Sequence, residues 1–269
     1  MSVFSKLDPD MITFHILPHL DGKSLIILSS VSSQFHNLIS KINSNSDLWR
    51  NICISTWPSL LTNFPSKDFH SSVISVLPGG YRSFFLDAFP SIHPPLNNPL
   101  PPLPPKLFFF FAVDIFLDGE QQQPPLYSLH SAELVKKEGC LDYLKQKLTL
   151  SCVAIDPKGS TKCAGSLFSP GCKAVAAKRV VLGVEVVFET VLPVPERLYH
   201  IHTEMIKCEM KVTCIWEGKR EDKFRVRLID FTMKDMNGRH LFDRHGAVVI
   251  LNAIQYGLRK ARTTSTQLV

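Results

Sequence analysis

The segment from Glu204 to Leu228 decides the fold of the C-terminal half and reads EMIKCEMKVTCIWEGKREDKFRVRL. Over its first half, apolar side chains alternate with charged or polar ones. The apolar set is Ile206, Cys208, Met210, Val212, Cys214 and Trp216. A period of two is typical of a strand with one buried face. Glu217–Asp222 then turns the chain and the alternation resumes, so the segment predicts a β-hairpin.

The rest of the chain after residue 106 is also rich in strand signals. We expect further strands at Leu107–Leu117, Leu148–Ile155, Val180–Val191 and Leu198–His202, with a turn at Met236–Gly238. Near the end, helical spacing links Ala247, Ile250, Leu251, Ile254 and Leu258, with Asn252, Gln255, Arg259 and Arg262 opposite. Residues 107–269 therefore predict an antiparallel β-sandwich-like domain closed by a C-terminal helix.

Residues 5–53 are instead dense in helix signals. Asp8 is placed to cap a helix that starts at Pro9 and ends or kinks at Pro18. Ser32 or Ser33 can cap a later helix, and Ser46 or Asp47 a last one. Three or four short helices of this length bury little apolar surface alone, so we expect them to pack against a partner or a second domain.

Residues 54–106 connect these two parts, which makes the chain α+β overall. The segment ends in a proline-rich stretch, Pro90–Pro105, which predicts a stiff polyproline-like spacer. Pro101–Lys106 also fits the PxxPxK pattern of an SH3 ligand. We favour the spacer interpretation.

Composition narrows the class of protein. The chain has 269 residues, of which 45% are hydrophobic and 20% charged, which excludes disorder throughout. The longest apolar run, Leu107–Val113, is too short to cross a bilayer, and the first residues lack the apolar core of a secretion signal. Seven cysteines without a Cys-x-x-Cys pair indicate reduced thiols rather than disulfides or zinc. We expect a soluble intracellular protein.

Signals for catalysis or cofactor binding are sparse. The sequence holds no phosphate-binding glycine loop, no nucleophile elbow and no His-Glu-x-x-His motif. His200-x-His202 could place two imidazoles on one strand face, but no third metal ligand is evident. A cysteine–histidine nucleophile stays open, since nothing selects a pair. We expect no cofactor and no metal.

The charge is placed unevenly. Residues 1–100 hold six basic and six acidic side chains, so the net charge of +6 falls entirely on the remainder. That excess favours acidic partners, but it is far below the charge of a dedicated nucleic-acid binder, and nucleic acid is an unlikely partner.

The N-terminal residues follow a known pattern. It starts with Leu-Pro, and Pro9 takes the proline position, while Asp8 stands where the pattern has leucine and Leu7 lies one residue earlier. The later matches are Ile16, Leu17, Leu20, Leu25, Val31, Phe35 and Leu48-Trp49-Arg50. This segment resembles an F-box. Further matches at Asp21-Gly22, Ser55–Ser59, Pro78–Phe85, Ile155–Pro157 and Asp235–Gly238 resemble plant F-box proteins with an uncharacterised C-terminal region.

The resemblance implies a non-catalytic receptor subunit of an Skp–cullin–F-box (SCF) ubiquitin ligase. The F-box would bind a Skp-family adaptor and, through it, a cullin and its RING subunit, while the C-terminal domain would hold a protein for ubiquitination and degradation. By position in the family pattern, the adaptor contacts would be Pro9, Ile16, Leu17, Leu20, Val31, Phe35 and Trp49. The substrate-binding residues and the substrate stay open, and the expected location is the nucleus or the cytoplasm.

Two other classes of function remain as alternatives. One is a lectin-like or small-molecule-binding β-domain that carries a degenerate F-box. The other is an intracellular enzyme, which would need a cluster of polar side chains in a pocket of the sheet domain.

Overall fold

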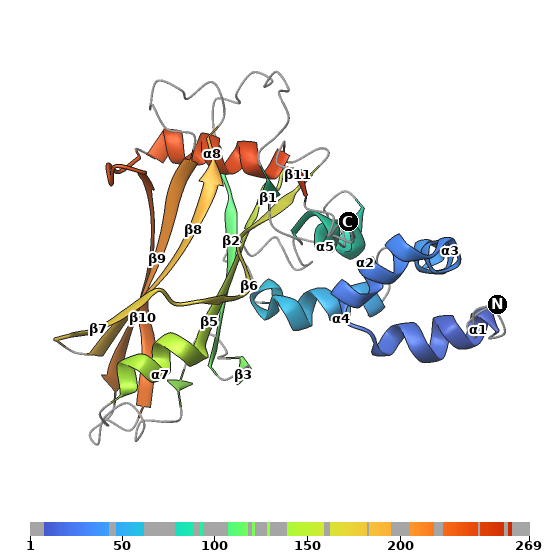
Figure 1. Ribbon diagram of the computed structural model, residues 1–269, viewed down its shortest axis with the longest axis horizontal. Helices are drawn as coiled ribbons and strands as arrows, with labels where there is room; N and C mark the ends of the chain where they lie inside the picture. Colours follow the sequence, from blue (N-terminus) through green and yellow to red (C-terminus); the bar gives the residue numbers. More distant parts are fainter. Residues whose placement is uncertain are drawn as a thin grey trace, which may run out of the picture. The chain divides into compact units, whose positions relative to one another are not determined.

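The computed structural model of the chain divides into two compact units, residues 1–86 and residues 87–260. The first is helical and the second is built mainly from β-strands, so the predicted α+β class is confirmed (Figure 1). We call them the helical unit and the β unit. The structure describes residues 8–42, 47–61, 79–88, 92–93, 107–117, 120–121, 128–129, 139–158, 162–181, 183–194, 205–217, 223–241, 243–255 and 258–259.

The helical unit consists of short helices joined by tight connections. In chain order they are α1 (Pro9–Met11), η2 (Ile12–Ile16), η3 (Leu17–His19), α2 (Gly22–Val31), α3 (Ser33–Lys41), α4 (Asp47–Thr56), η4 (Pro58–Leu61) and α5 (Gly80–Ala88). The first three follow one another without a break, as a helical turn each of α, π and 3₁₀ type. The predicted end near Pro18 is confirmed, because η3 stops at His19.

The β unit contains two larger antiparallel sheets and one small one. The four-stranded sheet has the order β3 (Glu120–Gln121), β2 (Phe110–Leu117), β5 (Leu148–Ile155) and β6 (Ala164–Lys173). The five-stranded sheet has the order β4 (Ser128–Leu129), β10 (Lys223–Asp235), β9 (Met205–Glu217), β8 (Gly183–Pro193) and β7 (Ala176–Val180). β1 (Ile92–His93) pairs with β11 (Leu258–Arg259).

The hairpin predicted from the alternating pattern is confirmed as β9 and β10. The two strands pair from Ile206 opposite Asp235 to Glu217 opposite Lys223, with one bulge between Val226 and Leu228. On β9, the apolar positions Ile206 to Cys214 are buried in a core that both larger sheets share. Helices α7 (Cys140–Lys147) and α8 (Asp243–Gln255) lie at opposite ends of the strands and complete this core (Figure 1).

One predicted strand is wrong in its extent. The run Val180–Val191 is not continuous: β7 ends at Val180, and β8 begins at Gly183 and pairs back on β7. Val181, at the turn, is fully exposed. Gly183 must lack a side chain, because a Cβ there would collide with the carbonyl of Cys214 on β9. The valines on both sides have strand propensity, so Gly183 is the one local signal for a break in this run.

The C-terminal helix also differs from its prediction. Helix α8 starts at Asp243 and ends at Gln255, so Leu258 and Arg259 belong to β11 instead. Asn252, expected on a polar face, is buried. Helices α5 and α7 and strand β6 were not predicted. The proposed strand Leu198–His202 and the proline-rich stretch Pro90–Pro105 lie outside the described residues.

All seven cysteines lie within the described residues and are free, and Cys172 is the one that is partly exposed. Burial raises the pKa of Cys163, Cys208 and Cys214 to about 12. Since the thiolate is the reactive form, these side chains are both inaccessible and protonated at neutral pH.

We therefore expect iodoacetamide at pH 8 to alkylate Cys172 first in the native chain. The six buried cysteines should react only after unfolding in guanidinium chloride, which serves as the control for complete labelling. Peptide mass spectrometry would locate the modified residues. Equal labelling of several cysteines in the native chain would contradict the burial described here.

Candidate functional site

The first helical segment begins where the sequence predicts. Asp8 caps α1, its Oδ1 accepting a hydrogen bond from the N–H of Asp10 at 2.9 Å, and Pro9 occupies the first helical position. Proline suits this position because its missing N–H would have no partner there. The side chain of Pro9 is exposed.

A π-helical turn then changes which residues face inward. The N–H of Leu17 donates to the carbonyl of Ile12, five residues earlier. The wider turn brings Ile12 and Leu17 onto one side, where both are buried. Met11 and Phe14 remain 50% and 67% exposed.

Helices α2 and α3 are set by two polar caps. Oδ1 of Asp21 accepts from the N–H of Ser24 at 2.6 Å, and this hydrogen bond lowers the pKa of Asp21. Oγ of Ser32 accepts from the N–H of Phe35 at 3.4 Å, so Ser32 is the cap of α3. Between these caps, α2 presents Ile27 and Val31 outward, 40% and 68% exposed. Their four-residue spacing places them on one face of α2.

An aromatic cluster joins α4 to α5. The rings of Trp49 and Phe85 have centroids 6.0 Å apart, and Trp57 lies 5.6 Å from Phe84, edge to face, and 5.5 Å from Phe85. Cys53 adds a contact from its Sγ to the carbonyl of Tyr81 at 3.3 Å. These contacts bury both indole rings and fix α5 against the preceding helices of the unit.

Gly22 lets α2 approach the same cluster. A Cβ at this position would collide with the ring of Phe85 and with the Cγ2 methyl group of Ile52. The Asp21-Gly22 pair therefore has two structural roles. The aspartate caps α2, and the glycine provides the space in which α2 packs against α4 and α5.

The structure places the seven expected adaptor contacts in two groups. Pro9 and Val31 are exposed, and Ile16 and Leu20 are half-buried, so these four are accessible at the surface of the unit. Leu17, Phe35 and Trp49 are buried and pack inside the unit.

The sequence analysis did not identify Phe14 and Ile27 as outward-facing side chains. A regular α-helical period would place Met11, Ile12, Ile16 and Leu17 on one face, but the π turn breaks this period and leaves Met11 exposed. Phe14 lies off that apolar face, which is the signal for its exposure. Ile27 had no separate signal, because Leu25–Leu28 is a continuous apolar run.

The described part of the chain offers little for metal binding. No group of three or more His, Cys, Asp or Glu side chains in it could hold a metal ion. His200 and His202 lie outside the described residues. No helix in the described ranges has the length and apolarity needed to cross a membrane.

Comparison with known proteins identifies the helices as a recognised domain. A family model described as F-box-like matches residues 9–55, that is, α1 through nearly all of α4. The chain is 28% identical to the probable F-box protein At2g36090 of Arabidopsis thaliana over 282 aligned positions, which cover 96% of this chain and 76% of the relative.

Two further Arabidopsis thaliana relatives match a shorter stretch. F-box protein At3g44326 is 37% identical over 107 residues, and F-box protein At2g27310 is 34% identical over 116 residues. These alignments cover 40% and 43% of this chain but only 27% and 31% of the two relatives. No solved structure matches the chain.

The close approach at Gly22 generates a stability prediction. Gly22→Ala should destabilise the helical unit by about 1–3 kcal/mol, because the added methyl group forces Phe85 or Ile52 out of position. Amide hydrogen exchange of α2 and α4, followed by mass spectrometry, would report the loss as faster exchange. Ser30→Ala, at an exposed position of the same helix, should leave exchange unchanged. Equal amide exchange rates in Gly22→Ala and Ser30→Ala would contradict the close packing of Gly22 against Phe85 and Ile52.

Proposed function

Because the chain carries an N-terminal F-box-like domain and is similar to a plant F-box protein over most of its length, we propose that it is the substrate-recognition subunit of an SCF ubiquitin ligase. In this role the helical unit binds a Skp-family adaptor, and through it a cullin and a RING subunit. The β unit holds a target protein for ubiquitination and degradation. We expect the chain to act in the nucleus or the cytoplasm.

The observation that carries the proposal is the set of apolar side chains that the F-box-like domain leaves exposed. Met11, Phe14, Ile27 and Val31 are all large and apolar, and each is at least 40% exposed. From Ser24 to Ser33 the chain has no charged residue, so Lys23 in the first turn is the one charged side chain of α2. Exposed apolar side chains gathered in one small domain are typical of a surface that a partner covers.

The buried members of the expected contact set have a supporting role in this proposal. Leu17, Phe35 and Trp49 hold the helices at fixed angles, and the exposed residues make the contact. No catalytic group is required of this chain. The ligase brings a charged ubiquitin-conjugating enzyme close to the bound target, and proximity alone supplies the acceleration.

Val31→Asp tests the adaptor surface. Val31 is 68% exposed, so the variant should fold normally, but a carboxylate would be desolvated in an apolar contact. We expect the affinity for a purified Skp-family adaptor, measured by isothermal titration calorimetry, to fall by at least about tenfold.

Val181→Asp is the matched control, since Val181 is a fully exposed valine of the β unit. It should bind the adaptor as the wild type does. Wild-type affinity in Val31→Asp would reject this face as the adaptor surface. A wild-type chain that folds but binds no adaptor would reject the ligase role itself.

A further inference from the structure

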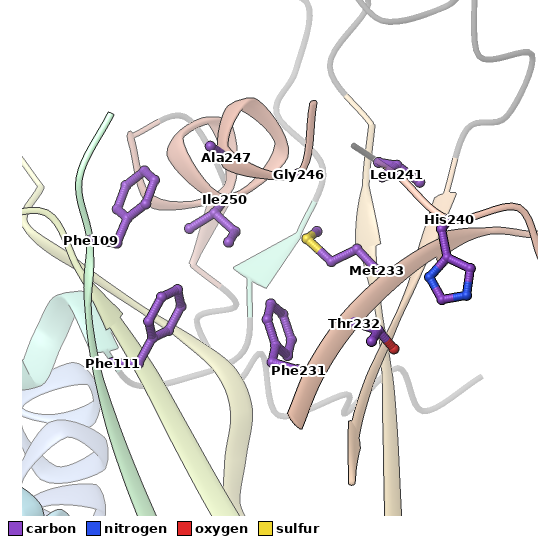
Figure 2. A pocket seen from close by; sticks show the side chains of 10 residues that line it. All are labelled: Phe109, Phe111, Phe231, Thr232, Met233, His240, Leu241, Gly246, Ala247 and Ile250. Atoms are coloured by element: carbon purple, nitrogen blue, oxygen red, sulfur yellow. The ribbon is translucent and has the colours of Figure 1, made fainter. Parts of the chain in front are cut away.

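The β unit contains an open apolar pocket of about 380 Å³, between the start of β2, the end of β10 and helix α8. Figure 2 shows the rings of Phe109, Phe111 and Phe231 around the same space as the side chains of Met233 and Ile250. Its polar lining residues are Thr232 and His240, and the described lining includes no Asp, Glu, Lys or Arg. Its volume lies within the range of sites that bind a ligand or a partner's side chain.

The aromatic wall of the pocket is packed and reaches the surface. The ring of Phe231 lies 6.0 Å from that of Phe111 and 6.4 Å from that of Phe168, measured between centroids. Such contacts hold the rings in place. Phe111 is nevertheless 44% exposed, so the pocket opens to solvent on this side.

Backbone groups of β10 lie beside this pocket. The carbonyl of Met233 accepts from the N–H of Leu241, and the N–H of Asp235 donates to the carbonyl of Arg239, both at 2.9 Å. These groups therefore point away from β9. The β9–β10 register is uninterrupted from Leu228 to Asp235, and backbone direction alternates along an antiparallel strand.

The N–H and C=O groups of Ile229 and Phe231 consequently point to the same edge as those of Met233. β4 pairs with β10 only at Phe224 and Arg225, two strand positions that lie before this stretch. Within the described residues, no backbone hydrogen bond covers the edge of β10 at Ile229 and Phe231. Edge groups that no described residue pairs, spaced in this way, match the backbone of another extended strand.

We propose that an extended segment of a partner protein adds to this edge of β10 and places one large apolar side chain in the pocket. The edge would supply backbone hydrogen bonds, and the pocket would supply specificity. A small molecule could fill the pocket but could not pair with successive backbone groups along the edge. This inference rests on the proposed function, since it gives the target protein its recognition element.

Selection from a phage library of random 12-residue peptides on the full-length chain tests the proposal. We expect enrichment of peptides in which one Phe, Leu, Met or Trp is flanked by residues with high strand propensity. Replacing that residue by Ala, or methylating the peptide's own backbone nitrogens, should weaken binding of the enriched peptide about tenfold. These changes leave the protein untouched.

Two protein variants separate the pocket from the edge. Gly246→Ala would put a methyl group 3.1 Å from Sδ of Met233 and narrow the pocket, and should weaken peptide binding on the order of tenfold. Ile229→Pro removes an N–H from the edge, where proline is tolerated, and should weaken it about threefold to tenfold. Leu228→Ser, at an exposed side chain of the same strand, is the control and should bind as the wild type.

The outcomes separate this inference from the ligase role. The inference would be overturned if no peptide were enriched, or if the enriched peptides bound both variants as tightly as the wild type. Neither result would count against adaptor binding, which is measured separately. Peptides that follow the expected pattern on a chain that binds no Skp-family adaptor would support the edge site and reject the ligase role.

Discussion

The helical unit depends on one aromatic cluster, in which Trp49 and Trp57 pack against Phe84 and Phe85. Four short helices bury too little apolar surface to be stable alone, and these rings add a fifth helix from beyond the recognised domain. The F-box-like match ends at residue 55, whereas the packed unit extends to residue 86. The compact unit is therefore larger than the family pattern, and its buried aromatic rings come from both sides of the pattern's end.

The β unit separates a charged face from an apolar core. On the outer side of the five-stranded sheet, Lys178 pairs with Glu185 at 2.7 Å and Lys207 with Glu189 at 2.6 Å. Glu209, more buried than these, is held by Lys234 at 3.1 Å and by Lys211 at 3.3 Å. Exposed pairs contribute little stability each, but they keep this face hydrated. A hydrated face disfavours burial against a partner, which leaves the edge of β10 as the better place for recognition.

Features that depend on residues close together in the sequence could be predicted from it. Features that depend on contacts between distant parts of the chain could not. The Asp8 cap, the strand Leu148–Ile155 and the β9–β10 hairpin each depend on neighbouring residues, and the structure has all three. The close approach of Gly183 to Cys214 on β9 depends on residues far apart in the sequence, which composition does not encode. For the candidate site, family position selected Val31, which the structure shows to be exposed, and Leu17, Phe35 and Trp49, which it shows to be buried. The exposure of Phe14 and Ile27 follows only from how the helices pack.

The π turn at Ile12–Ile16 has a consequence for how this chain is aligned with others. Its hydrogen bond spans five residues instead of four, so the turn holds one residue more than an α-helix would. Each residue of an α-helix advances about 100° around the axis. Counted without the surplus residue, Leu7 falls at the leucine position of the family pattern, but Pro9 then leaves the proline position. A one-residue deletion here would therefore exchange the proline match for a leucine match, and it would turn the residues before it by roughly a quarter of a circle or more.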